Sequence, residues 1–261
     1  MNQFSLAVAK IEMWFRAPSD AALGAIGTGF FYKCNNQSHL ITNWHNVTGV
    51  NPETGQLLHS QGLIPNQLRV HYKRWTDESK TVVKSDHFDL PLYSENKALW
   101  FEHSSRQSVD VVTVPFNEPS PDWANTYINQ ADQEGRLTVY AGMDCYILGF
   151  PKDLFGAAFT PIWKRGSIAA EPYNSHPYYI DSATRKGMSG APVIVRHSGI
   201  LKFGDGALSG SDVIGTVERF VAIYSGRIGD DELGAQLGRA WQVSVLDDIL
   251  TLATAGEHPI G

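Results

Sequence analysis

The chain is poor in cysteine, in clustered basic residues and in long apolar runs, and each shortage excludes a class of protein. Only two cysteines, Cys34 and Cys145, occur among the 261 residues, far apart in the sequence. This excludes a disulfide framework and a cysteine-based zinc site. The net charge is −6, and basic residues cluster only in "HYKRW" at 71–75, so we expect no nucleic-acid partner. No window of about 18 apolar residues occurs, so we expect no membrane span.

The first residues, "MNQFSLAVAKIEMWF", also lack a basic region before their apolar stretch, which contains Lys10 and Glu12. This pattern differs from that of a secretory signal peptide. The sequons at Asn36 and Asn46 are tripeptides that arise often by chance. We therefore expect a soluble protein located in the cytoplasm.

The chain contains many short apolar or alternating segments, each closed by Gly, Pro, Asn or Asp. With 43% hydrophobic and 18% charged residues, it has enough apolar side chains for a sizeable core. Short segments of this kind predict strands joined by turns, and therefore two all-β halves. The polar, Pro-interrupted stretch 117–136 predicts a linker between these halves. In "VSVLDDILTLA", apolar residues recur at helical spacing, which predicts an amphipathic helix near the end of the chain.

The stretch "TRKGMSGAPVIV" places Ser189 between Gly187 and Gly190, just before an apolar segment. A serine that attacks a carbonyl needs a base for its proton and backbone N–H groups for the oxyanion. Gly187 allows a sharp turn, after which the amides of Gly187 and Ser189 could point at one spot. A plain turn before a strand explains the same letters, since Gly and Ser are common turn residues.

Candidates for the base and its carboxylate occur at strand ends. His45 follows the apolar segment "HLIT", where a strand gives way to a turn. Asp110 precedes the apolar run of "SVDVVTVPF", and a carboxylate at the mouth of a buried strand needs a partner. An imidazole is a suitable partner, because a carboxylate fixes the tautomer of the catalytic histidine. Asp86 and Asp89 compete for this role, although neither opens a comparable strand.

The order His, Asp, Ser is that of the chymotrypsin architecture, and the local contexts agree with it. "GTGFFY…HLITNWHNV" resembles the Gly-rich strand and the histidine-bearing strand end of trypsin-like peptidases. "DVVTVPF" resembles their Asp strand, and "GMSGAPV" resembles their nucleophile loop. "VAIYSGR", at 221–227, resembles the strand whose backbone pairs with the substrate. The sequence thus resembles the trypsin-like serine peptidases of the chymotrypsin fold, of the bacterial, disulfide-poor type.

This resemblance implies an all-β fold of two antiparallel β-barrels with a C-terminal helix. We expect residues 1–116 to form the N-terminal barrel with His45 and Asp110, and 117–136 to form the linker. Residues 137–230 are then the C-terminal barrel with Ser189, and 231–261 an extension that contains the helix.

The resemblance also implies the site. Ser189 is the expected nucleophile, His45 its base and Asp110 the supporting carboxylate, while the backbone amides of Gly187 and Ser189 form the oxyanion hole. The expected substrate-binding residues are Ala183, Ser225 and Gly226. A protein or peptide is the expected substrate, no cofactor or metal is expected, and a dedicated partner protein would fit the resemblance.

The sequence departs from the family at several positions. Met188 stands where secreted members carry an aspartate that pairs with a new N-terminus, so we expect no activation by N-terminal cleavage. Ala183, at the base of the expected specificity pocket, is not acidic and argues against a strong preference for Arg or Lys; Arg227 would flank this pocket. Cys34 lacks the local disulfide partner of the secreted enzymes, and a glycan on Asn46 would crowd the cleft.

Two other functions are compatible with parts of this pattern. An α/β-hydrolase esterase needs G-x-S-x-G before a helix, whereas "GMSGA" has Ala191 last and precedes a predicted strand. That fold also needs its histidine after the serine, which leaves only His197 and His258. The second alternative is a catalytically silent module of the same fold that binds peptides or partner proteins. The presence of all three catalytic residue types argues against it, whereas Met188 leaves the resting loop conformation open.

Overall fold

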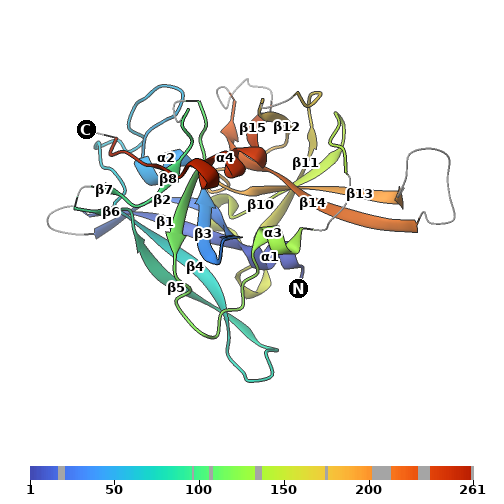
Figure 1. The fold of residues 1–261 in the computed structure, drawn as a ribbon, viewed down its shortest axis with the longest axis horizontal. Helices are drawn as coiled ribbons and strands as arrows, with labels where there is room; N and C mark the ends of the chain where they lie inside the picture. The colour runs from blue at the N-terminus through green and yellow to red at the C-terminus, as the bar shows by residue number, and fades with distance from the viewer. Residues whose placement is uncertain are drawn as a thin grey trace.

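The computed structural model describes residues 1–16, 21–95, 97–105, 108–132, 137–173, 176–201, 213–228 and 236–259. Strands dominate this part of the chain, and the few helices are short (Figure 1). The helices are α1 (Gln3–Ala7), α2 (Trp44–Thr48), α3 (Ile128–Ala131) and α4 (Ser244–Leu252), with short 3-10 segments at Pro151–Asp153 and Ala157–Phe159. No helix of this part is long and apolar enough to cross a membrane.

The strands are distributed along the whole described chain. They are β1 (Val8–Arg16), β2 (Ala21–Cys34), β3 (Gln37–Thr42), β4 (Gln67–Trp75), β5 (Val83–Pro91), β6 (Tyr93–Ser94), β7 (Lys97–Ala98), β8 (Phe101–Glu102), β9 (Val112–Phe116), β10 (Asp144–Gly149), β11 (Ile162–Ile168), β12 (Tyr178–Asp181), β13 (Pro192–Leu201), β14 (Val213–Arg227), β15 (Leu237–Gln242) and β16 (Thr254–Ala255).

These strands form two main antiparallel units, as the sequence predicted. The N-terminal unit is an eight-stranded sheet with the order β16-β8-β9-β3-β2-β1-β4-β5. The C-terminal unit is a closed barrel with the order β10-β11-β12-β15-β14-β13. The predicted all-β class with its chymotrypsin-like pair of units is therefore confirmed.

Two strands of the predicted extension 231–261 pair with strands of the two main units. β15 lies within it and pairs with both β12 and β14, so this strand belongs to the barrel. A barrel leaves no unpaired edge, and without β15 this one would have two. β16 also lies in the extension and pairs with β8 of the N-terminal sheet. The predicted helix between these strands is confirmed as α4.

Three apolar clusters form the core, and one of them joins the two units. One fills the N-terminal sheet, around Ile11, Phe31 and Leu68. A second fills the barrel, and a third contains residues of both units together with Phe4 of α1 and Leu246 of α4. In Figure 1, α4 lies between the two units, as this shared cluster requires. Residues of both units thus share one apolar core.

The predicted linker is packed against the N-terminal sheet. Trp75 N donates to Asp122 O at 2.8 Å, and Ala124 N donates to Lys73 O at 2.9 Å. Its helix α3 supplies Ile128 to the shared apolar cluster. The last linker residues, 133–136, lie outside the described residues.

Lys73, on β4, is a buried base inside the N-terminal unit. Its side chain is 1% exposed, and Nζ donates to Val8 O at 3.0 Å. Burial lowers the pKa of Lys73 to about 7, because the charged ammonium loses its hydration. The unfolded chain therefore binds more protons than the folded one between pH 7 and the ordinary lysine pKa.

Replacing Lys73 by methionine is expected to increase the free energy of unfolding at pH 7 by a few kcal/mol. The depressed pKa destabilises the wild type fully below about pH 7. This penalty fades as the pH rises toward 10, so the stability of the wild type should rise over that interval. Urea unfolding at pH 7 and 9.5 measures both effects. The exposed Lys84 on β5 provides the control Lys84→Met. Equal pH slopes in wild type and Lys73→Met would contradict the prediction.

Candidate active site

His45 and Asp110 meet because their strands are paired. β3 and β9 are antiparallel neighbours with Thr42 opposite Val112, so the residues beyond these ends are close. His45 Nδ1 lies 2.7 Å from Asp110 Oδ2, and the backbone N of His45 donates to Asp110 Oδ1 at 2.9 Å. Asp110 is 2% exposed. A buried carboxylate at this distance holds the proton on Nδ1 and leaves Nε2 as a base.

Ser225 supports the same carboxylate. Its hydroxyl donates to Asp110 Oδ2, the oxygen that also contacts His45. The sequence predicted Ser225 as a substrate-binding residue, whereas its side chain is bound to Asp110. Ser225 and Gly226 also line a cavity of about 200 Å³ beside His45. Their role in substrate binding stays a prediction.

The loop with Ser189 has the backbone that its glycines predict. Gly187 has φ +97° and Gly190 has φ +85°, the left-handed region that favours glycine. Ser189 lines a cavity of about 670 Å³ together with Gly187 and His45. No hydrogen bond joins Ser189 Oγ to the His45 ring within the described residues. His45 is thus hydrogen-bonded to Asp110, whereas Ser189 and His45 line the same cavity without a hydrogen bond between them.

Two contacts fix the peptides around Gly187. Lys152 N donates to Lys186 O at 2.8 Å, and Thr28 Oγ1 donates to Gly187 O at 2.7 Å. In a trans peptide the N–H points opposite to the C=O, so the N–H of Gly187 points away from Lys152. Among the described residues, neither Gly187 N nor Ser189 N donates to a protein acceptor. Both amides of the predicted oxyanion hole thus lack a protein acceptor among the described residues, and both residues line the cavity.

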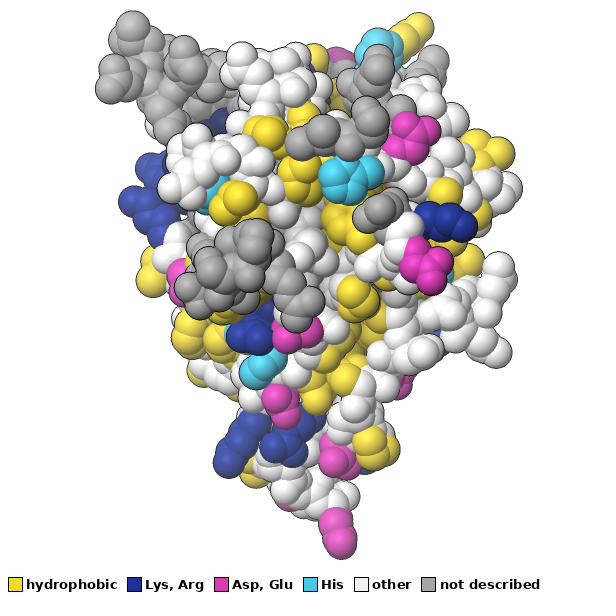
Figure 2. Space-filling model, turned by 90° about the vertical axis from the view of Figure 1, so that its left-hand side faces the viewer, with side chains coloured by type: hydrophobic (Ala, Val, Ile, Leu, Met, Phe, Trp, Pro, Cys, Tyr) yellow, Lys and Arg dark blue, Asp and Glu magenta, His cyan; other side chains and the backbone are white. Residues whose placement is uncertain are grey.

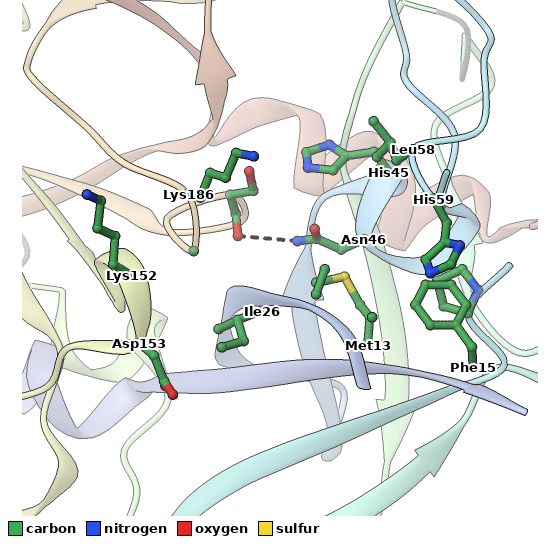
Figure 3. Close-up of a pocket in the computed structure, with 16 residues that line it drawn as sticks. Met13, Phe15, Ile26, His45, Asn46, Leu58, His59, Lys152, Asp153 and Lys186 are labelled. Carbon is green, nitrogen blue, oxygen red and sulfur yellow. Dashed lines mark hydrogen bonds between the residues drawn. The ribbon is translucent and has the colours of Figure 1, made fainter. Parts of the chain in front are cut away.

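A polar network that the sequence analysis missed joins the serine loop to the N-terminal sheet. Thr28 N and Asn46 Nδ2 both donate to Ser189 O, at 2.8 and 3.2 Å; Figure 3 marks the second bond. Asn46 Nδ2 also donates to Thr42 Oγ1 at 2.9 Å, and Thr42 Oγ1 donates to Thr28 O at 2.8 Å. All three network side chains are buried. Polar residues within the apolar segments "GTGFF" and "LITNWHN" were the available signal, because buried polar groups need partners.

Two departures from the family pattern have a structural counterpart. Met188 is fully buried in the apolar cluster of the barrel, so packing holds this residue of the loop in place of an ion pair. The side-chain nitrogen of Asn46 is buried in the network, which leaves its sequon no accessible acceptor for a glycan. Cys34 and Cys145 are both free.

The sequence predicts Ala183 at the base of the specificity pocket, and this stays a prediction. Ala183 lines neither of the two cavities beside His45. Its carbonyl accepts from Arg185 Nη1 at 3.1 Å. Next to it, Thr184 Oγ1 shares a hydrogen bond with the hydroxyl of Tyr224, a side chain that is 2% exposed. The protein's own tyrosine therefore packs against this part of the loop.

His45 stands between the two cavities, so the cleft continues on both sides of the imidazole. Figure 2 shows histidine side chains and hydrophobic side chains together near the middle of one face, with charges of both signs around them. Among the described residues, no group of three or more His, Cys, Asp or Glu could hold a metal ion. The chemistry that this arrangement offers is acid–base and nucleophilic.

Two antiparallel units, a histidine paired with a buried carboxylate, and a glycine-flanked serine that lines the same cavity as this histidine define the class as a protein with the serine peptidase fold. A sequence model of the trypsin-like peptidase domain matches residues 27–201, so the chain belongs to the trypsin-like peptidase family. Among solved structures, it is similar to Rv3671c from M. tuberculosis H37Rv, in an inactive form with a serine replaced by alanine. The identity is 17% and the TM-score 0.45, over 95% of this chain and 87% of that one. No curated protein matches this chain.

Proposed function

We propose that the protein is a serine endopeptidase that cleaves peptide bonds through an acyl-enzyme on Ser189. The observation that carries this proposal is the 2.7 Å contact between His45 Nδ1 and the buried Asp110 carboxylate, at the cavity that Ser189 lines. A buried carboxylate bound to a histidine beside a free serine hydroxyl suits nucleophilic acyl transfer. The family membership supports the same reaction and a protein or peptide substrate.

In the proposed reaction, Ser189 Oγ attacks the carbonyl carbon of the scissile peptide bond while His45 Nε2 takes the hydroxyl proton. The amides of Gly187 and Ser189 hold the negative oxygen of the tetrahedral intermediate. Asp110 stabilises the imidazolium that forms, without taking a proton itself. His45 then gives its proton to the leaving amine as the C–N bond breaks. Water, deprotonated by His45, attacks the acyl-enzyme. His45 then gives this proton to Ser189 Oγ as the ester C–O bond breaks, which releases the acid and restores the serine hydroxyl.

A fluorophosphonate probe tests the proposal directly. We expect the wild type to gain the mass of one probe minus HF, because the activated serine attacks phosphorus, its proton is lost and fluoride leaves. Ser189→Ala should not be labelled, and His45→Ala should be labelled far more slowly. Intact-protein mass spectrometry measures the adduct, and peptide mapping places it.

Ser198 on β13 provides the matched control. It is an exposed serine nine residues after the candidate nucleophile, and its hydroxyl shares a hydrogen bond with Thr216 Oγ1 at 2.8 Å. Ser198→Ala should be labelled as fast as the wild type. A wild type that no fluorophosphonate labels, while it remains folded, would instead favour the silent peptide-binding module.

A further inference from the structure

The larger cavity beside Ser189 combines an apolar floor with a cationic wall. Its apolar lining includes Met13, Phe15, Ile26 and Leu58. Figure 3 shows Lys152 and Lys186 on one side of this cavity, and Phe15 with His59 on the other. With a volume of about 670 Å³, the cavity can accept more than one side chain of a peptide.

The two lysines are held together at the wall of the cavity. The backbone N of Lys152 donates to the carbonyl of Lys186 at 2.8 Å, so the two residues are neighbours although they are far apart in the sequence. Both side chains are exposed, and neither forms an ion pair within the described part of the chain. Two ammonium groups without an ion-pair partner among the described residues therefore belong to the lining of the cavity that contains Ser189.

Asp153 also lines this cavity, but its carboxylate is paired with a lysine outside the cationic wall. Its Oδ1 lies 2.7 Å from the ammonium of Lys10, which also contacts Glu12 at 2.9 Å. In Figure 3 the Asp153 side chain points away from the two lysines of the wall. Asp153 therefore does not neutralise the positive charges of Lys152 and Lys186.

The local charge is opposite to that of the whole chain, whose net charge is −6. A negatively charged protein repels acidic peptides at long range, but fields beyond about a Debye length are screened by salt. Within the cavity the lysines act at short range on a bound substrate. The cleft can therefore favour anionic segments although the molecule as a whole does not.

Leu58 is an exposed apolar side chain in the lining of this cavity. Its side chain is 54% exposed, although it is a large aliphatic group, and it lines both cavities beside His45. Phe15 and Met13 lie beneath, each 5% exposed. A bulky apolar side chain of the substrate would cover Leu58 and complete this lining.

We propose that this cavity is a specificity subsite that selects, on one side of the scissile bond, a bulky apolar residue next to an acidic one. The apolar side chain packs on Ile26 and Leu58, and the carboxylate pairs with Lys152 and Lys186. This inference rests on the proposed peptidase function and adds the class of peptide that the enzyme prefers.

The test compares matched peptides that differ only in one acidic residue and its amide, glutamate against glutamine, beside a leucine near the cut. We expect the wild type to show a kcat/KM several-fold higher for the glutamate peptide at low salt, with the ratio falling at 1 M salt. In Lys152→Gln/Lys186→Gln the ratio should approach one, and in Lys152→Glu/Lys186→Glu it should invert. Leu58→Gln should reduce the preference for leucine over serine beside the glutamate.

A control pair separates local from overall charge. Lys84 and Lys97 are exposed and line none of the cavities described above, and Lys84→Gln/Lys97→Gln changes the net charge by the same amount. This variant should keep the wild-type ratio. A ratio near one in the wild type, or a ratio that both double variants lower equally, would overturn the subsite.

The same comparison can be made without catalysis. Fluorescence anisotropy of the two labelled peptides with Ser189→Ala measures binding alone, and the glutamate peptide should bind several-fold tighter. Loss of fluorophosphonate labelling would refute the peptidase but not this difference in binding. Equal binding of the two peptides, with labelling intact, would refute the subsite and leave the peptidase standing.

Discussion

Asp110→Asn is expected to lower kcat by about 10⁴-fold while the fold stays intact. The asparagine amide would donate to His45 Nδ1, which must then accept, so the ring proton moves to Nε2. That nitrogen can no longer take the proton of Ser189. The remaining side-chain oxygen of residue 110 can still accept from the backbone N of His45, at 2.9 Å in the wild type. The bond with Ser225 must reverse, so that the asparagine amide donates to the Ser225 hydroxyl oxygen.

Hydrolysis of a chromogenic ester or a fluorogenic peptide, together with the rate of fluorophosphonate labelling, measures the loss. Asp144→Asn is the matched control, because Asp144 on β10 is a surface carboxylate paired with Arg165 at 2.9 Å. Its loss should leave kcat within about twofold, as exposed ion pairs contribute little. If Asp110→Asn kept more than a tenth of the wild-type kcat, the carboxylate would not orient the base.

The pairing of His45 with Asp110 could be predicted from the sequence because each residue ends or opens a recognisable strand. The apolar segments on either side of the candidates became β3 and β9, and their pairing brought the two side chains together. The helix at 243–253 was equally predictable from its spacing, and the structure places α4 there. A local sequence pattern is therefore enough to predict the position of a residue that lies next to the end of a strand.

The contacts that hold the serine loop could not be predicted in this way. Thr28 lies 161 residues before Ser189 in the chain, and its role depends on how the two units dock. The same holds for Ser225, whose short motif gave no sign that its hydroxyl faces Asp110 rather than the substrate. β15 was missed as a barrel strand because closure depends on pairing with two distant strands.

Docking of the two units brings the candidate site together. The N-terminal unit supplies His45, Asp110 and Thr28, while the C-terminal unit supplies Ser189 and the backbone amides around it. Thr28 holds the serine loop through two bonds, one from its backbone N to Ser189 O and one from its hydroxyl to Gly187 O. With Met188 buried in the barrel, the loop is anchored from both sides of the cleft.

Gly187→Ala is expected to reduce kcat by roughly 10²- to 10³-fold, the usual effect of losing one oxyanion donor. A Cβ at this position would lie 2.3 Å from Phe150 O, and φ is +97°, where L-residues are strained. To relieve the clash, the peptide between Lys186 and Gly187 must rotate. Rotation breaks the bond from Lys152 N to Lys186 O and turns the Gly187 N–H away from the cavity.

Substitution of Gly142 is the control that separates the effect of a positive φ from the effect of the steric clash at Gly187. Gly142 has a similar φ of +84°, but a Cβ there would meet nothing within 4 Å, and the residue lines none of the cavities described. Gly142→Ala should therefore lower the free energy of unfolding by about 1 kcal/mol and leave kcat unchanged. Steady-state kinetics and urea unfolding of the two variants give the comparison. If Gly187→Ala lost stability as Gly142→Ala does but kept its kcat, the amide of residue 187 would not bind the oxyanion, and Ser189 N would have to act alone.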